Sequence, residues 1–351
     1  MNKKAKFSKT TKDHLMTYAM VIVLYIVVQA LIAAGVLGSH LQGLLVPVCY
    51  YAICAVALNL CVGILGELSI GHCGFMCVGA FTSAVFSFAT QDVLPGGIRF
   101  LLAFLIGIIC AAVIGFLIGI PVLRLNGDYL AIVTLAFGEI IKNINNAIYL
   151  GVDGSGIHIS LASANKLNLA EDGKIIINGA MGITGTPRNA NFTIAVIVLL
   201  IALFVVQNLI DSRDGRAIMS IRDNRIAAEA SGINVTKYKM TAFTISAAIA
   251  GAAGVLFSHN ISSLTSTSQY FGYNASIMIL VYVVLGGIGN IRGSVIAAII
   301  LYLLPELLRG LANYRMLIYS IVLIAMMLFN WAPASITFRK KFAARFRKEK
   351  A

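Results

Sequence analysis

Long apolar runs alternate with short polar connections over almost the whole chain. A helix needs about 20 apolar residues to cross roughly 30 Å of hydrocarbon, since each residue adds about 1.5 Å. Ten runs reach or approach this length, and we predict membrane spans at 18–37, 44–63, 68–89, 98–120, 128–149, 192–210, 239–258, 273–289, 291–309 and 314–331. The pattern predicts an all-α fold, a polytopic transmembrane helical bundle of about ten spans that forms a single domain over 1–351.

Composition supports a membrane protein, and charge indicates its orientation. Hydrophobic residues make up 59% of the 351 positions and charged residues only 12%, unlike the balance of a soluble domain. The formal net charge of +13 comes mainly from Lys and Arg in the segments 1–17 and 332–351 and at the ends of apolar runs. Such clusters are typical of cytoplasmic segments and of contact with anionic lipids, so we expect both termini to be basic cytoplasmic tails and expect no nucleic-acid partner. The first run is too long for a signal-peptide core and is expected to remain as a span.

The most polar interior stretch is 211–239, which has to lie in water between two spans. Residues 217–230 contain no Gly or Pro, which predicts a helix. Asp214 is a suitable N-cap, and Gly232 stands where helices tend to end. Apolar and charged residues mix at helical spacing, so one side of this helix can dock while the other stays solvated. The residues alone leave two interpretations open: a solvated cytoplasmic loop, or a lever that transmits movement from a partner.

The longest connection, 151–191, is predicted to be an external loop. It is rich in Gly and Asn and lacks a hydrophobic core of its own. Ordered connections of this length are usually functional, but a plain flexible loop fits the composition equally well.

Three apolar stretches contain residues that need a reason to lie in a membrane. Two are rich in glycine and belong to different halves of the chain, the first with Gly66, Gly71 and Gly74, and the second with Gly286, Gly287 and Gly289. Glycine-interrupted spans in two halves indicate a transport pathway, whereas close helix packing is the commoner use of membrane glycine. The third stretch contains Glu139, whose charge costs about 2.5–3.5 kcal/mol inside a bilayer. Lys142, one turn on, offers a structural ion pair, and the alternative is a polar rim that faces the solute.

Four stretches resemble the motifs of one family, in the same order along the chain: 58–79, 124–139, 211–235 and 280–293. The third contains Gly-Arg-Ala, Ile-Arg-Asp-Asn, Ala-Ala-x-x-x-Gly and Gly-Ile-Asn-Val. Together they resemble the permease subunits of bacterial ABC importers for branched-chain amino acids, and in particular the second of the two homologous permeases. The chain departs from the family pattern at Arg225 and Ile226, where acidic residues are usual, and at Ser294, where proline is usual.

The resemblance implies a permease subunit of an ATP-driven importer in the bacterial cytoplasmic (inner) membrane, which moves branched-chain amino acids by alternating access. Its implied partners are a homologous second permease, two ATP-binding cassette ATPase subunits, an extracytoplasmic solute-binding protein and the lipid membrane. The chain has no Gly-x-x-x-x-Gly-Lys-Ser/Thr loop, so we expect ATP and Mg²⁺ on the ATPase subunits only. In this chain we expect no bound cofactor, no metal and no catalytic residue. The alternatives are a related solute, such as urea, an amide or another amino acid, and an ion-coupled secondary transporter.

The residues and the resemblance together assign two sets of site residues. Contact with an ATPase is expected at Gly215, Arg216, Arg222, Asp223, Asn224, Ala227, Ala228 and Gly232. The solute pathway is expected along Gly66, Ser69, Gly71, His72, Gly74, Phe75, Thr134, Glu139, Gly286, Gly287 and Gly289. The glycines around His72 are expected to bend the backbone and to offer N–H groups to a carboxylate. His72 is expected to lie within reach of water, as is Glu67.

Overall fold

The computed structural model describes residues 9–91, 93–125, 127–153, 156–167, 169, 173–311 and 314–331. Residues 9–17 of the predicted N-terminal tail belong to the first helix. The predicted C-terminal tail, 332–351, lies outside the described residues, as do residues 1–8.

Each of the ten predicted spans coincides with a helix. These helices are α1 Lys9–Ala33, α2 Ser39–Asn59, α3 His72–Ala89, α4 Gly96–Val122, α5 Asp128–Ala147, α6 Phe192–Asp211, α9 Val235–Ser258, α10 Tyr273–Gly286, α11 Ile291–Leu307 and α12 Arg315–Trp331. The all-α fold is therefore confirmed.

The number of spans is approximate. Within the described residues, seven helical stretches are both long and apolar enough to cross a membrane. They are α1, α2 with its π-helical continuation η1 (Leu60–Leu65), α3, α4, α6, α9, and α11 with the short 3-10 turn η4 (Leu308–Leu311). Helix α10 is apolar but shorter, and α5 carries Asp128, Glu139 and Lys142.

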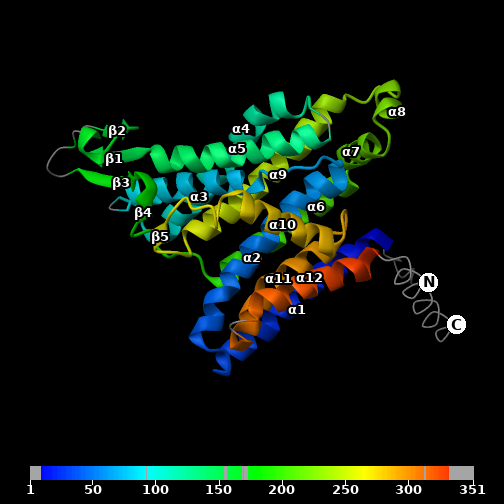
Figure 1. Cartoon of the computed structure of the whole chain (residues 1–351), viewed down its shortest axis with the longest axis horizontal. Coiled ribbons are helices and arrows are strands. Elements are labelled where there is room, and N and C mark those ends of the chain that lie inside the picture. Colours follow the sequence, from blue (N-terminus) through cyan, green and yellow to red (C-terminus); the bar gives the residue numbers. More distant parts are fainter. Residues whose placement is uncertain are drawn as a thin grey trace, which may run out of the picture.

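Helix α2 lies at the centre of the bundle and contacts α6, α9, α10 and α11 (Figure 1). It is almost completely buried from Val46 to its end, because its sequence is apolar on all sides and has no polar face to turn to solvent. Helices α3, α4 and α9 pack against one another on one flank, with α5 against α3. The tertiary core therefore runs along α2, α3 and α9.

The two ends of the bundle differ in structure (Figure 1). One end carries two short helices, α7 (Arg213–Asp223) and α8 (Arg225–Ala230), and is called the α7/α8 end below. The opposite end carries five strands, β1 Tyr149–Asp153, β2 Gly156–Ser160, β3 Lys174–Asn178, β4 Ile183–Thr184 and β5 Ser263–Leu264, and is called the sheet end.

The connection 151–191 contains more structure than its Gly- and Asn-rich composition predicted. Strand β1 lies between β2 and β3, antiparallel to both. Strand β4 pairs with β5 through Ile183 and Leu264, which fastens this connection to the segment after α9. Short 3-10 turns, η2 (Ala164–Leu167) and η3 (Gly179–Met181), complete it. The isoleucines of β2 and β3 carried a strand signal that the glycine content obscured.

Candidate functional site

The polar stretch 211–239 folds as two short helices instead of the single helix predicted over 217–230. Helix α7 begins after Ser212, whose Oγ accepts a hydrogen bond from the Gly215 amide at 3.0 Å, so Ser212 and not Asp214 is the N-cap. Asn224 interrupts the predicted helix with extended backbone (φ −156°, ψ 101°), and its Oδ1 caps α8 through the Ala227 amide at 3.0 Å. The prediction was wrong because an asparagine side chain competes for backbone hydrogen bonds and caps a helix better than it continues one.

Two glycines in this loop are required for different physical reasons. A Cβ on Gly215 would lie 2.1 Å from the Leu209 carbonyl oxygen, so only glycine lets α6 turn directly into α7. Gly232 has a φ of +82° and open space around it. Its amide and that of the next residue bond to carbonyls of the last turn of α8, at 3.0 and 3.1 Å. This is the usual glycine ending of a helix, and it confirms the predicted end at Gly232.

Helix α8 has a buried side and an exposed side. Ala228 is buried with Ile221 and Val235 in a small apolar cluster that belongs to the loop itself. Ile226 is 81% exposed, although it was not among the residues predicted to contact an ATPase. Among the eight residues predicted to contact an ATPase, Gly215 and Ala228 are buried, and six are exposed, namely Arg216, Arg222, Asp223, Asn224, Ala227 and Gly232.

Arg222 joins α7 to the end of the central helix. Its Nη1 donates a hydrogen bond to the carbonyl oxygen of Gly63, in η1, at 2.9 Å. Its Nε and Nη2 donate to Asp223 Oδ1 at 3.0 and 2.9 Å, which fixes the guanidinium. A Cβ on Gly66 would lie 2.5 Å from Arg222 Cγ. Gly66 is therefore the residue that lets the arginine side chain lie flat against the backbone.

A buried ion pair lies next to this contact. Glu67 pairs with Lys239, near the start of α9, and their side chains are only 13% and 4% exposed. Glu67 is therefore largely shielded from the water that the sequence predicted around it. The pair connects positions 172 residues apart, so no local pattern in the sequence indicated it. Removal of either partner would leave an uncompensated charge in a buried place.

The backbone between η1 and α3 is not helical, so the bend lies before His72, and Gly74, one of the two glycines expected to form it, is inside α3. Gly66, with φ +81°, ends the helix formed by α2 and η1, and α3 begins at His72. His72 is 1% exposed, so the prediction that water reaches it was wrong. Its Nε2 lies 2.6 Å from Ser246 Oγ on α9, and its Nδ1 lies 3.2 Å from Ser69 Oγ. His72 thus connects the bend to α9.

Two amides in the first turn of α3 already have hydrogen-bond partners. The Cys73 amide donates to Ser276 Oγ at 3.4 Å, and the Gly74 amide donates to the Gly71 carbonyl at 2.9 Å. Among the described residues, no group of three or more His, Cys, Asp or Glu side chains is placed to hold a metal ion.

Glycines at the start of α3 allow close contact with α5. A Cβ on Gly71 would lie 2.2 Å from the Thr134 carbonyl oxygen, and one on Gly74 would lie 2.9 Å from Gly138 Cα. The Thr134 hydroxyl also accepts a hydrogen bond from the Ile70 amide at 3.0 Å. The ring of Phe75 lies 5.2 and 5.5 Å from phenylalanine rings of α5 and α9, measured between centroids. These predicted pathway residues form a closely packed joint between α3, α5 and α9.

The second glycine-rich stretch is a break between α10 and α11. Helix α10 ends at Gly286, and Gly287 and Gly289 have φ values of +97° and +80°. Asn290 then caps α11, its Oδ1 accepting from the Gly293 amide at 3.3 Å. A Cβ on Gly286 would lie 2.4 Å from the Gly293 carbonyl carbon. The backbones of these two glycines therefore pack directly against each other.

The two glycine-rich stretches, predicted separately, meet at the α7/α8 end. Buried Asn59, the last residue of α2, accepts a hydrogen bond from the Gly289 amide at 2.8 Å and donates one to Ser294 Oγ at 2.8 Å. A Cβ on Gly63 would lie 2.3 Å from the Gly289 nitrogen. Ser294 stands where the family usually has proline, and here it supplies the hydroxyl that Asn59 needs.

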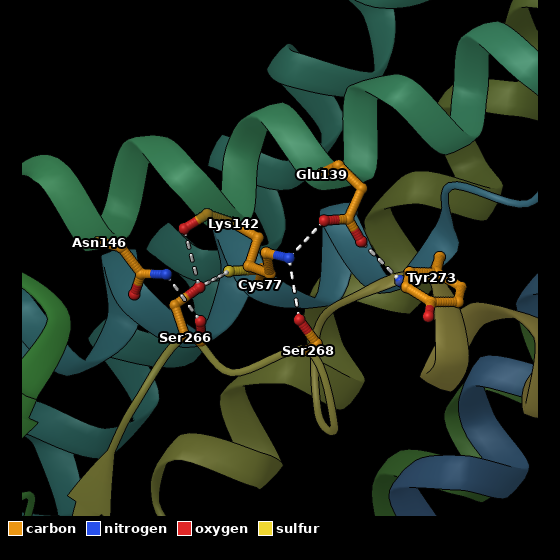
Figure 2. Close-up of polar contacts among 7 residues, drawn as sticks. All are labelled: Cys77, Glu139, Lys142, Asn146, Ser266, Ser268 and Tyr273. Carbon is orange, nitrogen blue, oxygen red and sulfur yellow. Dashed lines mark hydrogen bonds and ion pairs between the residues drawn. The ribbon is translucent and has the colours of Figure 1, made fainter.

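Glu139 and Lys142 form an ion pair on α5, as the structural interpretation predicted (Figure 2). Glu139 also accepts a hydrogen bond from the Tyr273 amide at 2.8 Å, and Lys142 donates one to Ser268 Oγ at 3.0 Å. One turn on, Asn146 donates to the Ser266 carbonyl at 3.0 Å. The carboxylate meets the first turn of α10, where the helix dipole favours negative charge. The pair therefore fastens α5 to the segment that leads into α10.

The arrangement combines a polar two-helix loop with an all-α bundle whose central helices are broken by glycine at that end. A family model described as the branched-chain amino acid transport system permease component matches residues 40–330. The chain belongs to this family. It is 35% identical to the high-affinity branched-chain amino acid transport system permease protein LivM of Escherichia coli over 295 residues, which are 82% of this chain and 67% of that protein.

Other members of the family are similar to different degrees. The LivM protein of Salmonella typhimurium is 34% identical over 299 residues, again 82% of this chain and 67% of that protein. The permease protein LivH of the same organism is 26% identical over 263 residues, 72% of this chain and 79% of that protein. No solved structure gave a significant match.

Proposed function

We propose that this chain is the membrane-spanning permease subunit of an ATP-driven importer for branched-chain amino acids. The relatives named above support the solute class. The higher identity to the LivM proteins than to LivH supports assignment as the second of two homologous permeases, with the first as its partner. Two ATPase subunits, which bind ATP and Mg²⁺, and an extracytoplasmic solute-binding protein complete the proposed assembly. The chain itself is not an enzyme.

We place both termini and the α7/α8 end in the cytoplasm and the sheet end outside. The Lys and Arg residues of 211–239 and of the two terminal segments support this orientation. The cytoplasmic ATPases then meet α8, where Ile226 and the charged residues around it are exposed.

The contact between Arg222 and Gly63 carries the proposed mechanism. Movement of α8 on an ATPase displaces α7, and Arg222 transmits this displacement to η1 at the point where the central helix is broken. The Glu67–Lys239 pair joins the same point to α9. Because the two glycine-rich breaks meet there, a small displacement is applied where the backbone resists bending least. The predicted pathway residues at the start of α3 and on α5 are packed against each other, and they contact solute only when these helices move apart.

Substitution of Ile226 tests the assignment of α8. In the complete complex, Ile226→Lys should lose most of the co-purified ATPase and most ATP-driven leucine uptake, because it places a positive charge where an apolar contact is expected and where an acidic residue is otherwise usual. Thr236→Lys, at an exposed position of the same loop outside α8, is the matched control and should behave as wild type. Normal ATPase binding and normal uptake by Ile226→Lys would contradict the assignment.

A reconstitution separates this proposal from an ion-coupled transporter. The complete complex in liposomes should accumulate leucine only with ATP inside the compartment that the α7/α8 end faces. This chain alone should accumulate none under a proton or sodium gradient. Gradient-driven uptake by the chain alone would identify a secondary transporter instead.

A further inference from the structure

A hollow of about 310 Å³ lies between α2, α10 and α11, beside the start of α10. It is lined chiefly by Tyr51, Gln269, Asn274, Met278, Tyr282 and Tyr302. Two other hollows, between α1 and α2 and between α4 and α6, are lined almost entirely by aliphatic and aromatic side chains. A third, beside α4 and α5, is mainly apolar but includes Thr82 and Asn145. The combination of two amides, three tyrosines and a thioether therefore distinguishes the hollow beside α10 from packing defects lined by apolar groups.

Three tyrosines give the hollow a fixed aromatic wall. The rings of Tyr51 and Tyr302 lie 5.0 Å apart, and those of Tyr51 and Tyr282 lie 6.3 Å apart at an interplanar angle of 85°. Tyr51 and Tyr282 are buried, so packing restricts their rotation. Met278 adds a thioether, which adapts its shape to an aliphatic group. An aliphatic side chain placed here would exchange water for apolar surface on several sides.

The mouth of the hollow is polar. Gln269 and Asn274 are exposed and come from the segment before α10 and from its first turn. An amide that faces hydrocarbon without a hydrogen-bond partner costs roughly 2–7 kcal/mol, so this face is suited to water or a polar ligand and not to lipid. Two amides can donate to a carboxylate and accept from an ammonium group. None of the described lining residues is charged, which favours binding weak enough to release the solute onward.

The Glu139–Lys142 pair positions this mouth. Glu139 accepts the hydrogen bond of the Tyr273 amide, at the residue directly before Asn274, and Lys142 bonds to Ser268, directly before Gln269. The ion pair thus holds both amide-bearing residues from one side while its own charges are neutralised. Glu139 is a positioning residue here and does not line the hollow.

We propose that this hollow is a solute-selecting site for a small zwitterion with an aliphatic side chain. The tyrosines and Met278 contact the aliphatic part of the solute, and Gln269 and Asn274 form hydrogen bonds to its charged groups. The inference rests on the proposed function and identifies the site that determines which solute the importer accepts. A volume at the lower limit of ligand sites, about 300–1,000 Å³, fits one small solute.

The test uses the complete complex in liposomes with leucine-loaded binding protein. Gln269→Ala and Asn274→Ala should each raise the KM for leucine uptake about fivefold, the effect of one lost hydrogen bond, while stimulated ATPase activity stays near wild type. Asn143→Ala, which removes an exposed amide on α5 that does not line the hollow, is the matched control and should leave KM unchanged. Met278→Ala should lower the preference for leucine over valine.

Accessibility gives a second readout that does not depend on the rate of uptake. Asn274→Cys should react with a membrane-impermeant thiol reagent, and saturating leucine-loaded binding protein with ATP should slow that reaction. The native cysteines are buried except for the partly buried Cys110, which sets a low background.

The outcomes separate the possible failures. Unchanged KM in both amide variants, or labelling of Asn274→Cys that solute does not slow, would overturn the assignment of the hollow. Loss of the second permease from purified Asn274→Ala complex, with normal uptake per remaining complex, would also overturn it and make this face a subunit interface. Absence of branched-chain amino acid uptake by the wild-type complex would instead overturn the proposed function.

Discussion

The break between η1 and α3 and the break between α10 and α11 have similar glycine content and contact each other, yet they are held differently. The first is held by charge, through Arg222 on the Gly63 carbonyl and through the Glu67–Lys239 pair. The second is held by neutral groups, with Asn59 on the Gly289 amide and on Ser294. Charged contacts connect the first break to α7 and α9, whereas the second is connected to α2 by neutral groups and to α1 by the Arg292 side chain, which donates to the Thr17 hydroxyl. We infer that the first break moves with the α7/α8 loop and that the second serves as its fixed counterpart.

Removing one charge from the first break should have the largest effect. Lys239→Ala leaves Glu67 buried without a partner, and such a loss costs about 3–5 kcal/mol. We expect little assembled complex, measured as the monodisperse peak in size-exclusion chromatography and its midpoint temperature. Lys237→Ala, at an exposed neighbouring position, should leave both values unchanged. A Lys239→Ala complex as stable as wild type would show that the ion pair does not hold this break.

Removing the neutral contact of the second break should have an intermediate effect. Asn59→Ala leaves the Gly289 amide without its acceptor, at about 1–3 kcal/mol for a buried unsatisfied group, and it also removes the bond to Ser294 Oγ, whose hydroxyl keeps its own bond to the Asn290 carbonyl. The midpoint temperature should fall less than in Lys239→Ala, and Ser294→Ala, which removes one of the two bonds, should lower it least. If Asn59→Ala proved more damaging than Lys239→Ala, the contrast between the two breaks would be reversed.

Adding one methyl group to each break gives the finest comparison. Gly66 and Gly289 both have left-handed backbone, so alanine costs roughly 1–2 kcal/mol at either position. Only at Gly66 would the new Cβ meet Arg222, at 2.5 Å from its Cγ, whereas at Gly289 the nearest atom lies at 3.5 Å. Gly66→Ala should therefore also lower leucine uptake per ATP hydrolysed, and Gly289→Ala should not. Equal uptake-to-hydrolysis ratios in the two variants would count against transmission through Arg222.

Helix positions were predictable because a lipid environment demands long apolar runs, and such runs can be read from the chain directly. The bend at Gly66 and the turn at Gly287 were predictable for a related reason, since glycine in an apolar run is the residue that permits a break. The helix break at Asn224 and the strands within 149–178 were missed, because composition over a long window conceals single capping residues and short strands.

The sequence by itself determined the class of the protein, the places of its spans, the polar loop 211–239 and the family to which it belongs. Only the tertiary structure decided which of these parts touch. It paired Glu67 with Lys239, placed Arg222 on Gly63 and joined Asn59 to Gly289, and it put His72 away from water. These contacts join residues 159 to 230 positions apart. Local patterns indicate the helix period and whether a segment lies in water or in lipid. The partner of a side chain across the bundle depends instead on how all the helices pack together.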